Sequence, residues 1–117
     1  MKNKAFHHRL GFAMSGFVHA VRSESSFRFH VLAAGMVLAL LIALRPAPMW
    51  WAVLTITIVT VLAAELFNTA LEHLADHVRP ELHPQIKLVK DCAAAAVLVA
   101  SIGAIAVAAA FFYEVCF

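Results

Sequence analysis

The chain is poor in charged residues, and this shortage excludes most soluble folds. Only 14% of its 117 residues are Asp, Glu, Lys or Arg, while 63% are hydrophobic. The mean hydropathy is +0.86. A small soluble domain has a far more polar composition. The composition therefore indicates an integral membrane protein.

The chain also has few glycines, which excludes the common phosphate-binding loops. Such loops need closely spaced glycines, so that backbone N–H groups can approach a phosphate. The four glycines of this chain are scattered, at Gly11, Gly16, Gly35 and Gly103. Neither a P-loop nor a kinase-type glycine loop is predicted.

The two cysteines exclude an intrachain disulfide. Cys92 and Cys116 stand at opposite ends of one apolar run, about 36 Å apart at the rise of an α-helix. That separation is far beyond the reach of a disulfide. No histidine and acidic residue can be placed beside either thiol to activate it. A cysteine nucleophile is therefore not predicted.

Three apolar runs are long enough to cross a membrane. Prolines at positions 46, 48, 80 and 84 separate them, because proline removes a backbone donor and biases the preceding residue away from a helix. We therefore predict an all-α membrane protein with one domain, residues 1–117. Its predicted transmembrane helices are 27–45, 49–79 with a cytoplasmic extension, and 85–115.

Residues 4–24 are predicted to form an amphipathic helix before the first span. Apolar side chains from Phe6 to Val21 recur on one face, while polar ones such as His8 and His19 lie opposite. Such a helix is expected to lie in the membrane surface with its apolar face in the lipid. The alternative is a basic tail that only sets topology.

The basic residues predict the orientation. The first loop holds Arg45 alone, whereas basic residues gather before the first span and in the second loop. By the positive-inside rule, the N-terminus and the second loop are cytoplasmic and the C-terminus is outside. The residues that support this are Lys2, Lys4, Arg9, Arg22, Arg28, Arg79, Lys87 and Lys90.

A stripe of polar residues marks the cytoplasmic end of the second span. Glu65, Asn68, Glu72 and Asp76 fall within about 80° of one another on a helix, and Arg79 continues the stripe. Ionisable groups at such a position are functional candidates because burying them is costly. The alternative for Asp76 and Arg79 is a solvated helix end.

The same boundary gathers further charged residues. Lys90 and Asp91 open the third span, and Glu24 lies between the surface helix and the first span. Mg²⁺ is usually held by one or two carboxylates plus substrate phosphates. Phosphoryl transfer needs that metal, a cation near the phosphates and a group that orients or deprotonates a hydroxyl. The sequence therefore favours phosphoryl transfer here.

The run Glu65–Asp76, with the sequence ELFNTALEHLAD, resembles the signature of the small bacterial membrane lipid kinases, the prokaryotic diacylglycerol kinase and undecaprenol kinase family. The spacing of Lys90 and Asp91 on the next helix matches as well. The likeness extends to residues 24–28 and covers nearly the whole chain.

The resemblance implies an ATP- and Mg²⁺-dependent kinase for a membrane lipid, in a bacterial cytoplasmic membrane and without a nucleic-acid partner. It also implies a homotrimer with active sites shared between subunits. The residue matching Glu65 is the expected general base, and those matching Glu24 and Glu72 hold Mg²⁺. Four more residues are expected to bind the nucleotide and its phosphates or to shape the site: Asn68, Asp76, Lys90 and Asp91. Of these, Asn68 and Asp91 are also expected to take part in catalysis.

The acceptor lipid is predicted less directly. The loop 79–84 and the run 90–97 resemble the undecaprenol kinase branch, and Ala94 stands where the diacylglycerol branch usually has serine. Undecaprenol is therefore the favoured acceptor. A small transporter and a non-catalytic membrane scaffold are the alternative functions, since carboxylates in spans also occur in transporters.

His73 and His77 are spaced i, i+4 and so share a helix face, as in some zinc sites. They flank the polar stripe, and no third ligand is placed by spacing. A structural or interfacial role is favoured over metal binding.

Overall fold

The computed structural model describes residue 3 and residues 5–117, so Lys4, the first residue of the predicted surface helix, lies outside the described residues. Lys2 lies outside them as well. The rest is all-helical and contains four helices, α1 (Phe6–Ser23), α2 (Ser25–Leu44), α3 (Pro48–Val78) and α4 (Pro84–Cys116). The last three are long and apolar enough to cross a membrane. The predicted all-α fold with three such helices is confirmed.

The helix ends follow from local sequence. Pro48 and Pro84 occupy the first turns of α3 and α4, where the missing proline N–H has no helical partner to lose. Arg45 ends α2 in the left-handed conformation, with a φ of 46°. Glu24 alone separates α1 from α2, because its extended backbone (φ −116°, ψ 110°) breaks the helical path. The chain therefore changes direction sharply at Glu24.

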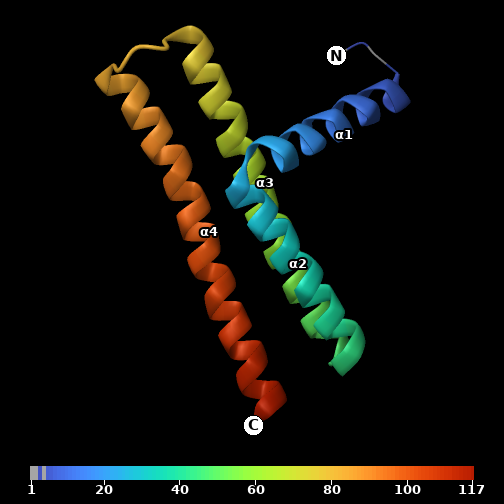
Figure 1. Cartoon of the computed structure of the whole chain (residues 1–117). Helices are drawn as coiled ribbons and strands as arrows, with labels where there is room; N and C mark the ends of the chain where they lie inside the picture. Colours follow the sequence, from blue (N-terminus) through green and yellow to red (C-terminus); the bar gives the residue numbers. More distant parts are fainter. Residues whose placement is uncertain (1–2, 4) are drawn as a thin grey trace.

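The helices α2, α3 and α4 run up and down beside one another (Figure 1). The closest packing is between α3 and α4, and α2 packs against α3. The helix α1 leaves this group at a steep angle from the start of α2. With 31 and 33 residues, α3 and α4 are much longer than the 20-residue α2. Their joined ends extend beyond the junction of α1 and α2, as Figure 1 shows.

The interior of the helix group is formed by a few apolar contacts. Leu41, Leu54 and Phe111 are buried together near the end that carries the C-terminus. Trp50 stacks edge-on against Phe111 with ring centroids 5.2 Å apart, and its indole N–H donates to Glu114. Aromatic pairs prefer this edge-to-face arrangement. These contacts join the first turns of α3 to the last turns of α4.

A second apolar contact holds α1 against α2. Phe27 is fully buried, and its ring meets Phe17 of α1 at a centroid distance of 5.1 Å and an interplanar angle of 77°. Ala20 of α1 is also buried, and a residue this small allows the helix backbones to approach closely. The direction of α1 is therefore set by side-chain packing as well as by the break at Glu24.

Most of the apolar surface of the three long helices remains exposed. Only 11%, 17% and 6% of their most apolar segments are buried within this chain. Contiguous apolar surface of this extent needs a membrane or other chains to cover it. Together with the length of the helices, this makes the chain an integral membrane protein.

Replacing Leu41 by alanine should destabilise the helix group by about 2 kcal/mol, because the neighbours cannot fill the void and dispersion contacts are lost. Leu32 of the same helix is 67% exposed, so Leu32→Ala is the matched control and should change stability little. Unfolding of the purified protein in detergent micelles measures both. Equal losses for the two variants would contradict this packing.

Candidate active site

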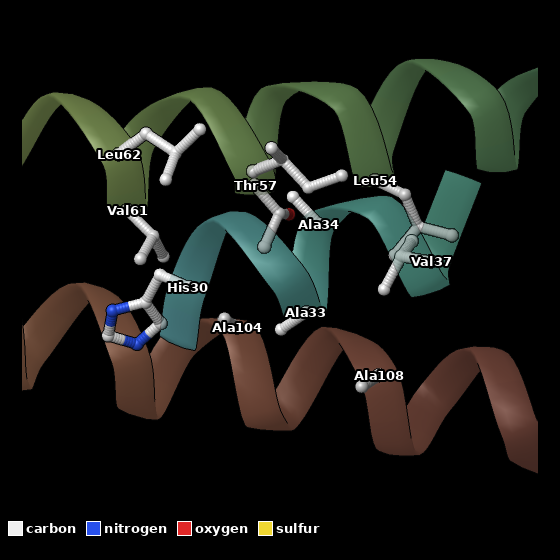
Figure 2. Close-up of a pocket in the computed structure, with 11 residues that line it drawn as sticks. His30, Ala33, Ala34, Val37, Leu54, Thr57, Val61, Leu62, Ala104 and Ala108 are labelled. Atoms are coloured by element: carbon white, nitrogen blue, oxygen red, sulfur yellow. The ribbon is translucent and has the colours of Figure 1, made fainter. Parts of the chain in front are cut away.

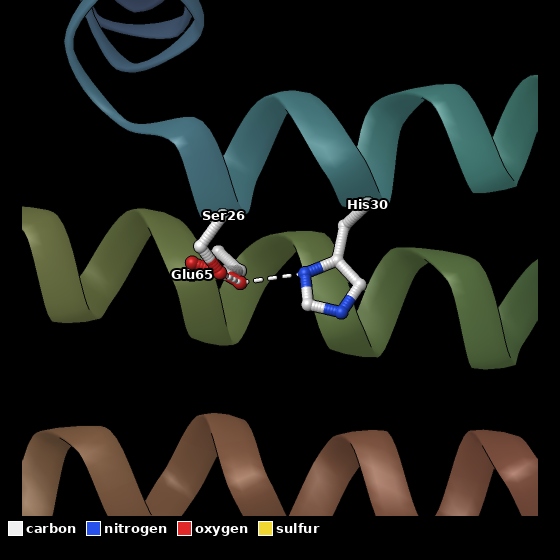
Figure 3. Close-up of polar contacts among 3 residues, drawn as sticks. All are labelled: Ser26, His30 and Glu65. Atoms are coloured by element: carbon white, nitrogen blue, oxygen red, sulfur yellow. Dashed lines mark hydrogen bonds and ion pairs between the residues drawn. The ribbon is translucent and has the colours of Figure 1, made fainter.

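Glu65 is the most deeply buried charged side chain among the residues that the structure describes, with 2% of its surface exposed. It lies on α3 and faces the first turns of α2 (Figure 3). Ser26 Oγ donates to Glu65 Oε1 at 2.6 Å, and His30 Nδ1 lies 2.6 Å from the same oxygen. A buried carboxylate is tolerated only with such partners. Glu65 is thus a fixed acid at a helix interface.

Ser26 and His30 were not predicted as site residues. Ser26 precedes the apolar run of α2, and His30 falls within it. Their i, i+4 spacing was the available signal, because it places two polar side chains on one helix face. That face packs on α3, as Figure 3 shows for both side chains.

Asn68 follows Glu65 by one helical turn and is half-buried. Its side-chain oxygen Oδ1 is buried and accepts no hydrogen bond from any residue that the structure describes. A buried amide oxygen without a donor costs free energy unless another group satisfies it. Asn68 therefore offers a free acceptor beside the buried carboxylate.

The next turns of α3 meet the start of α4. Lys90 Nζ donates to Asp76 Oδ1 at 2.5 Å, which joins two of the predicted nucleotide-binding residues. Asp91 is instead paired with Lys87 on its own helix, at 2.6 Å, and is exposed. The structure therefore brings Lys90 to α3 and leaves Asp91 on the outer face of α4.

Glu24 and Glu72, the predicted magnesium ligands, are both half-buried. Glu24 lies at the break between α1 and α2, and Glu72 lies two turns beyond Glu65 on α3. Within the described part of the chain, no three His, Cys, Asp or Glu side chains are close enough to hold a metal ion. The described residues alone thus do not form a complete cage for a metal.

His73, one of the two histidines that share a face of α3, contacts α1. His73 Nε2 lies 3.1 Å from His19 Nε2, so its partner is on α1 rather than at His77. The rings are 5.0 Å apart and tilted by 59°. The interfacial role favoured for His73 agrees with this contact, which links α1 to α3.

The loop between α3 and α4 contains its own ion pair. Arg79 Nε donates to Glu81 Oε1 at 2.6 Å, and this contact holds the pKa of the Glu81 carboxyl below its ordinary value. Arg79 thus turns toward the loop, and no hydrogen bond joins it to the polar stripe. An exposed pair of this kind contributes little to stability.

An apolar cavity of about 110 Å³ lies between α2, α3 and α4 (Figure 2). Alanines of α2 and α4 line much of it, and the ring of His30 borders it. His30 therefore contacts Glu65 through Nδ1 while another part of its ring borders an apolar space. Glu65 itself does not line the cavity, and His30 is the residue that contacts both.

The chain matches the family model described as prokaryotic diacylglycerol kinase over residues 11–112. The chain belongs to this family. That match includes all of α2 and α3, most of α1 and α4, and every predicted site residue, from Glu24 to Asp91. The chain is therefore an enzyme, a lipid kinase.

Three relatives agree with the family assignment. The chain is 34% identical to the undecaprenol kinase of Bacillus subtilis, over 85% of this chain and 86% of that protein. It is 37% identical to a diacylglycerol kinase of Synechocystis, over 82% of this chain and 55% of that protein. It is 33% identical to a diacylglycerol kinase of Pseudomonas aeruginosa, over 77% of this chain and 73% of that protein. The names of these relatives include both acceptor lipids.

Proposed function

We propose that this lipid kinase transfers the γ-phosphate of ATP to the hydroxyl of a membrane lipid, with undecaprenol as the acceptor. The observation that carries the proposal is Glu65, a buried carboxylate at the apolar interface of α2 and α3. A carboxylate there can accept a proton from a hydroxyl that arrives from the membrane.

The charged residues near the loop suit the nucleotide. Lys90 brings a cation to α3 through its contact with Asp76, and an ammonium group can contact phosphates as a point charge. Asn68 has a free buried oxygen one turn from Glu65. We assign Lys90, Asp76, Asn68 and Asp91 to binding the nucleotide or shaping its site, with Asn68 and Asp91 also supporting catalysis.

The residues present fit Mg²⁺ as a companion of the nucleotide. Glu24 and Glu72 supply hard carboxylate oxygens, and the lack of a three-residue cage among the described residues matches a metal that takes its remaining ligands from phosphates and water. When bound, Mg²⁺ neutralises phosphate charge during the transfer. We assign Glu24 and Glu72 to holding it.

Undecaprenol is favoured because, of the three relatives above, the one aligned over the largest share of its own length is named an undecaprenol kinase. The small apolar cavity bordered by His30 has room for part of one narrow hydrocarbon chain. Both features support an acceptor with a single hydrocarbon chain and a terminal hydroxyl.

The proposed setting is the bacterial cytoplasmic membrane, with the N-terminus inside. The basic residues around α1 and in the loop between α3 and α4 support that orientation. We propose that α1 lies in the membrane surface, as its steep angle to the other helices allows. A homotrimer with shared sites would cover the apolar surface left exposed on this chain, and the small residues of α4 permit close packing.

Glu65→Gln should lower kcat by about 100- to 10,000-fold, because the amide cannot accept the hydroxyl proton. The affinity for MgATP should stay nearly unchanged, since Glu65 contacts Ser26 and His30 of α2, whereas Lys90 contacts Asp76. Steady-state transfer of labelled γ-phosphate and a separate nucleotide-binding measurement check the two parts. A near-normal rate would overturn the role of Glu65 as base.

Glu72→Gln and Glu24→Gln should each raise the Mg²⁺ concentration for half-maximal activity by about tenfold, because an amide is a weaker magnesium ligand than a carboxylate. Glu81→Gln is the matched control, since Glu81 is paired with Arg79 in the loop. A magnesium titration of the three variants decides the assignment. Equal responses from all three would remove Glu24 and Glu72 from the metal site.

Purified protein in mixed micelles should phosphorylate undecaprenol with a kcat/KM about tenfold or more above that for diacylglycerol, because even one extra or missing methylene in an apolar pocket changes the fit by about 1–3 kcal/mol. The two lipids are offered in parallel with MgATP. A preference for diacylglycerol would reverse the acceptor assignment. Phosphorylation of neither by folded protein would contradict the proposed reaction.

A further inference from the structure

Both polar partners of Glu65 contact the same carboxylate oxygen. Ser26 Oγ and His30 Nδ1 each lie 2.6 Å from Oε1. Among the described residues, no hydrogen bond is made to Oε2. The two donors come from one face of α2, as Figure 3 shows. The carboxylate is therefore held by one oxygen and free at the other.

The two contacts to Oε1 fix the orientation of the carboxylate group. A carboxylate has two oxygens that each accept hydrogen bonds, and two donors on Oε1 fix the plane and direction of the group. Such a fixed group needs little reorganisation when it takes a proton. An unheld carboxylate in the same apolar surroundings would rotate and would lack compensation for its burial.

We infer that Ser26 and His30 are positioning residues for the transfer reaction, which hold Oε1 of Glu65 and present Oε2 to the acceptor hydroxyl. The inference rests on the proposed role of Glu65 as base. In the step they support, Oε2 takes the hydroxyl proton as the lipid oxygen bonds to the γ-phosphorus. The bond from that phosphorus to the bridging oxygen breaks, and ADP leaves with the electron pair.

The contact between His30 and Glu65 requires one particular protonation of the imidazole ring. With Glu65 ionised, the contact needs the imidazole to carry its proton on Nδ1, because a carboxylate only accepts hydrogen bonds. The remaining nitrogen, Nε2, makes no hydrogen bond with any described residue. The ring also borders the apolar cavity, as Figure 2 shows. His30 therefore joins the buried acid to the space beside it.

Two substitutions at His30 test whether its Nδ1 donor is what positions the Glu65 carboxylate. Asparagine places an amide N–H donor roughly where the imidazole Nδ1 stands, whereas leucine fills a similar volume without a donor. Ser26→Ala removes the second donor. Ser25→Ala is the matched control, since Ser25 is exposed and is the neighbouring residue on α2. Each variant is assayed in micelles with MgATP and undecaprenol, alongside Glu65→Gln.

His30→Leu should lower kcat by about 100-fold and Ser26→Ala by about 10-fold, since hydrogen bonds to a charged group are lost. His30→Asn should recover most of the loss and stay within about 10-fold of the unchanged protein. KM for MgATP and for the lipid should change less than about threefold, because neither residue is assigned to binding them. The Ser25→Ala rate should be unchanged.

Other results would overturn the inference. If His30→Asn loses as much as His30→Leu, the ring is needed for more than its Nδ1 donor, and the positioning account is wrong. Losses confined to KM would also contradict it. If His30→Leu fails to fold, the comparison of Ser26→Ala with Ser25→Ala, together with the His30→Asn rate, still decides the question.

The Glu65→Gln variant distinguishes a failure of the proposed base from a failure of the positioning role of Ser26 and His30. If it retains activity, the proposed base is wrong and the inference falls with it. If it is inactive while Ser26→Ala and His30→Leu keep their full rates, the base stands and only the positioning role is refuted.

Discussion

A carboxylate buried at an apolar helix interface is the constraint on which the rest of this structure depends. Moving such a charge away from water costs several kcal/mol unless hydrogen bonds compensate for it. Here the compensation for Glu65 comes from Ser26 and His30 on α2. The packing of α2 on α3, set further along by Leu41 and Leu54, is therefore also a condition for keeping the acid in place.

The same packing divides the molecule into two regions. On one side of Glu65, the apolar cavity and the buried contacts continue toward the C-terminal end of α4. On the other side, Lys90 and Asp76 form a charged contact near the loop. An enzyme that transfers a phosphoryl group from a nucleotide to a lipid needs an apolar approach for one substrate and a charged approach for the other. Glu65 lies between the two.

Much of this could be predicted from the sequence, because hydropathy and proline positions depend only on local chemistry. The three long helices, the breaks near Arg45 and Pro84, and the polar stripe from Glu65 to Asp76 follow from those patterns. The contacts that α1 and α2 make with α3 could not be predicted. Ser26, His30 and His19 reach α3 only because of how α1 and α2 dock on it, and docking depends on packing that spacing along one helix does not encode.

The most direct test of the central claim is the protonation of the His30 ring, observed by ¹⁵N NMR of histidine-labelled protein in lipid bilayers and assigned by comparison with His30→Asn. The account predicts a protonated Nδ1 whose resonance reports a hydrogen bond to Glu65 and shifts when Glu65 is replaced by alanine. An unprotonated Nδ1, or a resonance that does not respond to the loss of Glu65, would contradict the account.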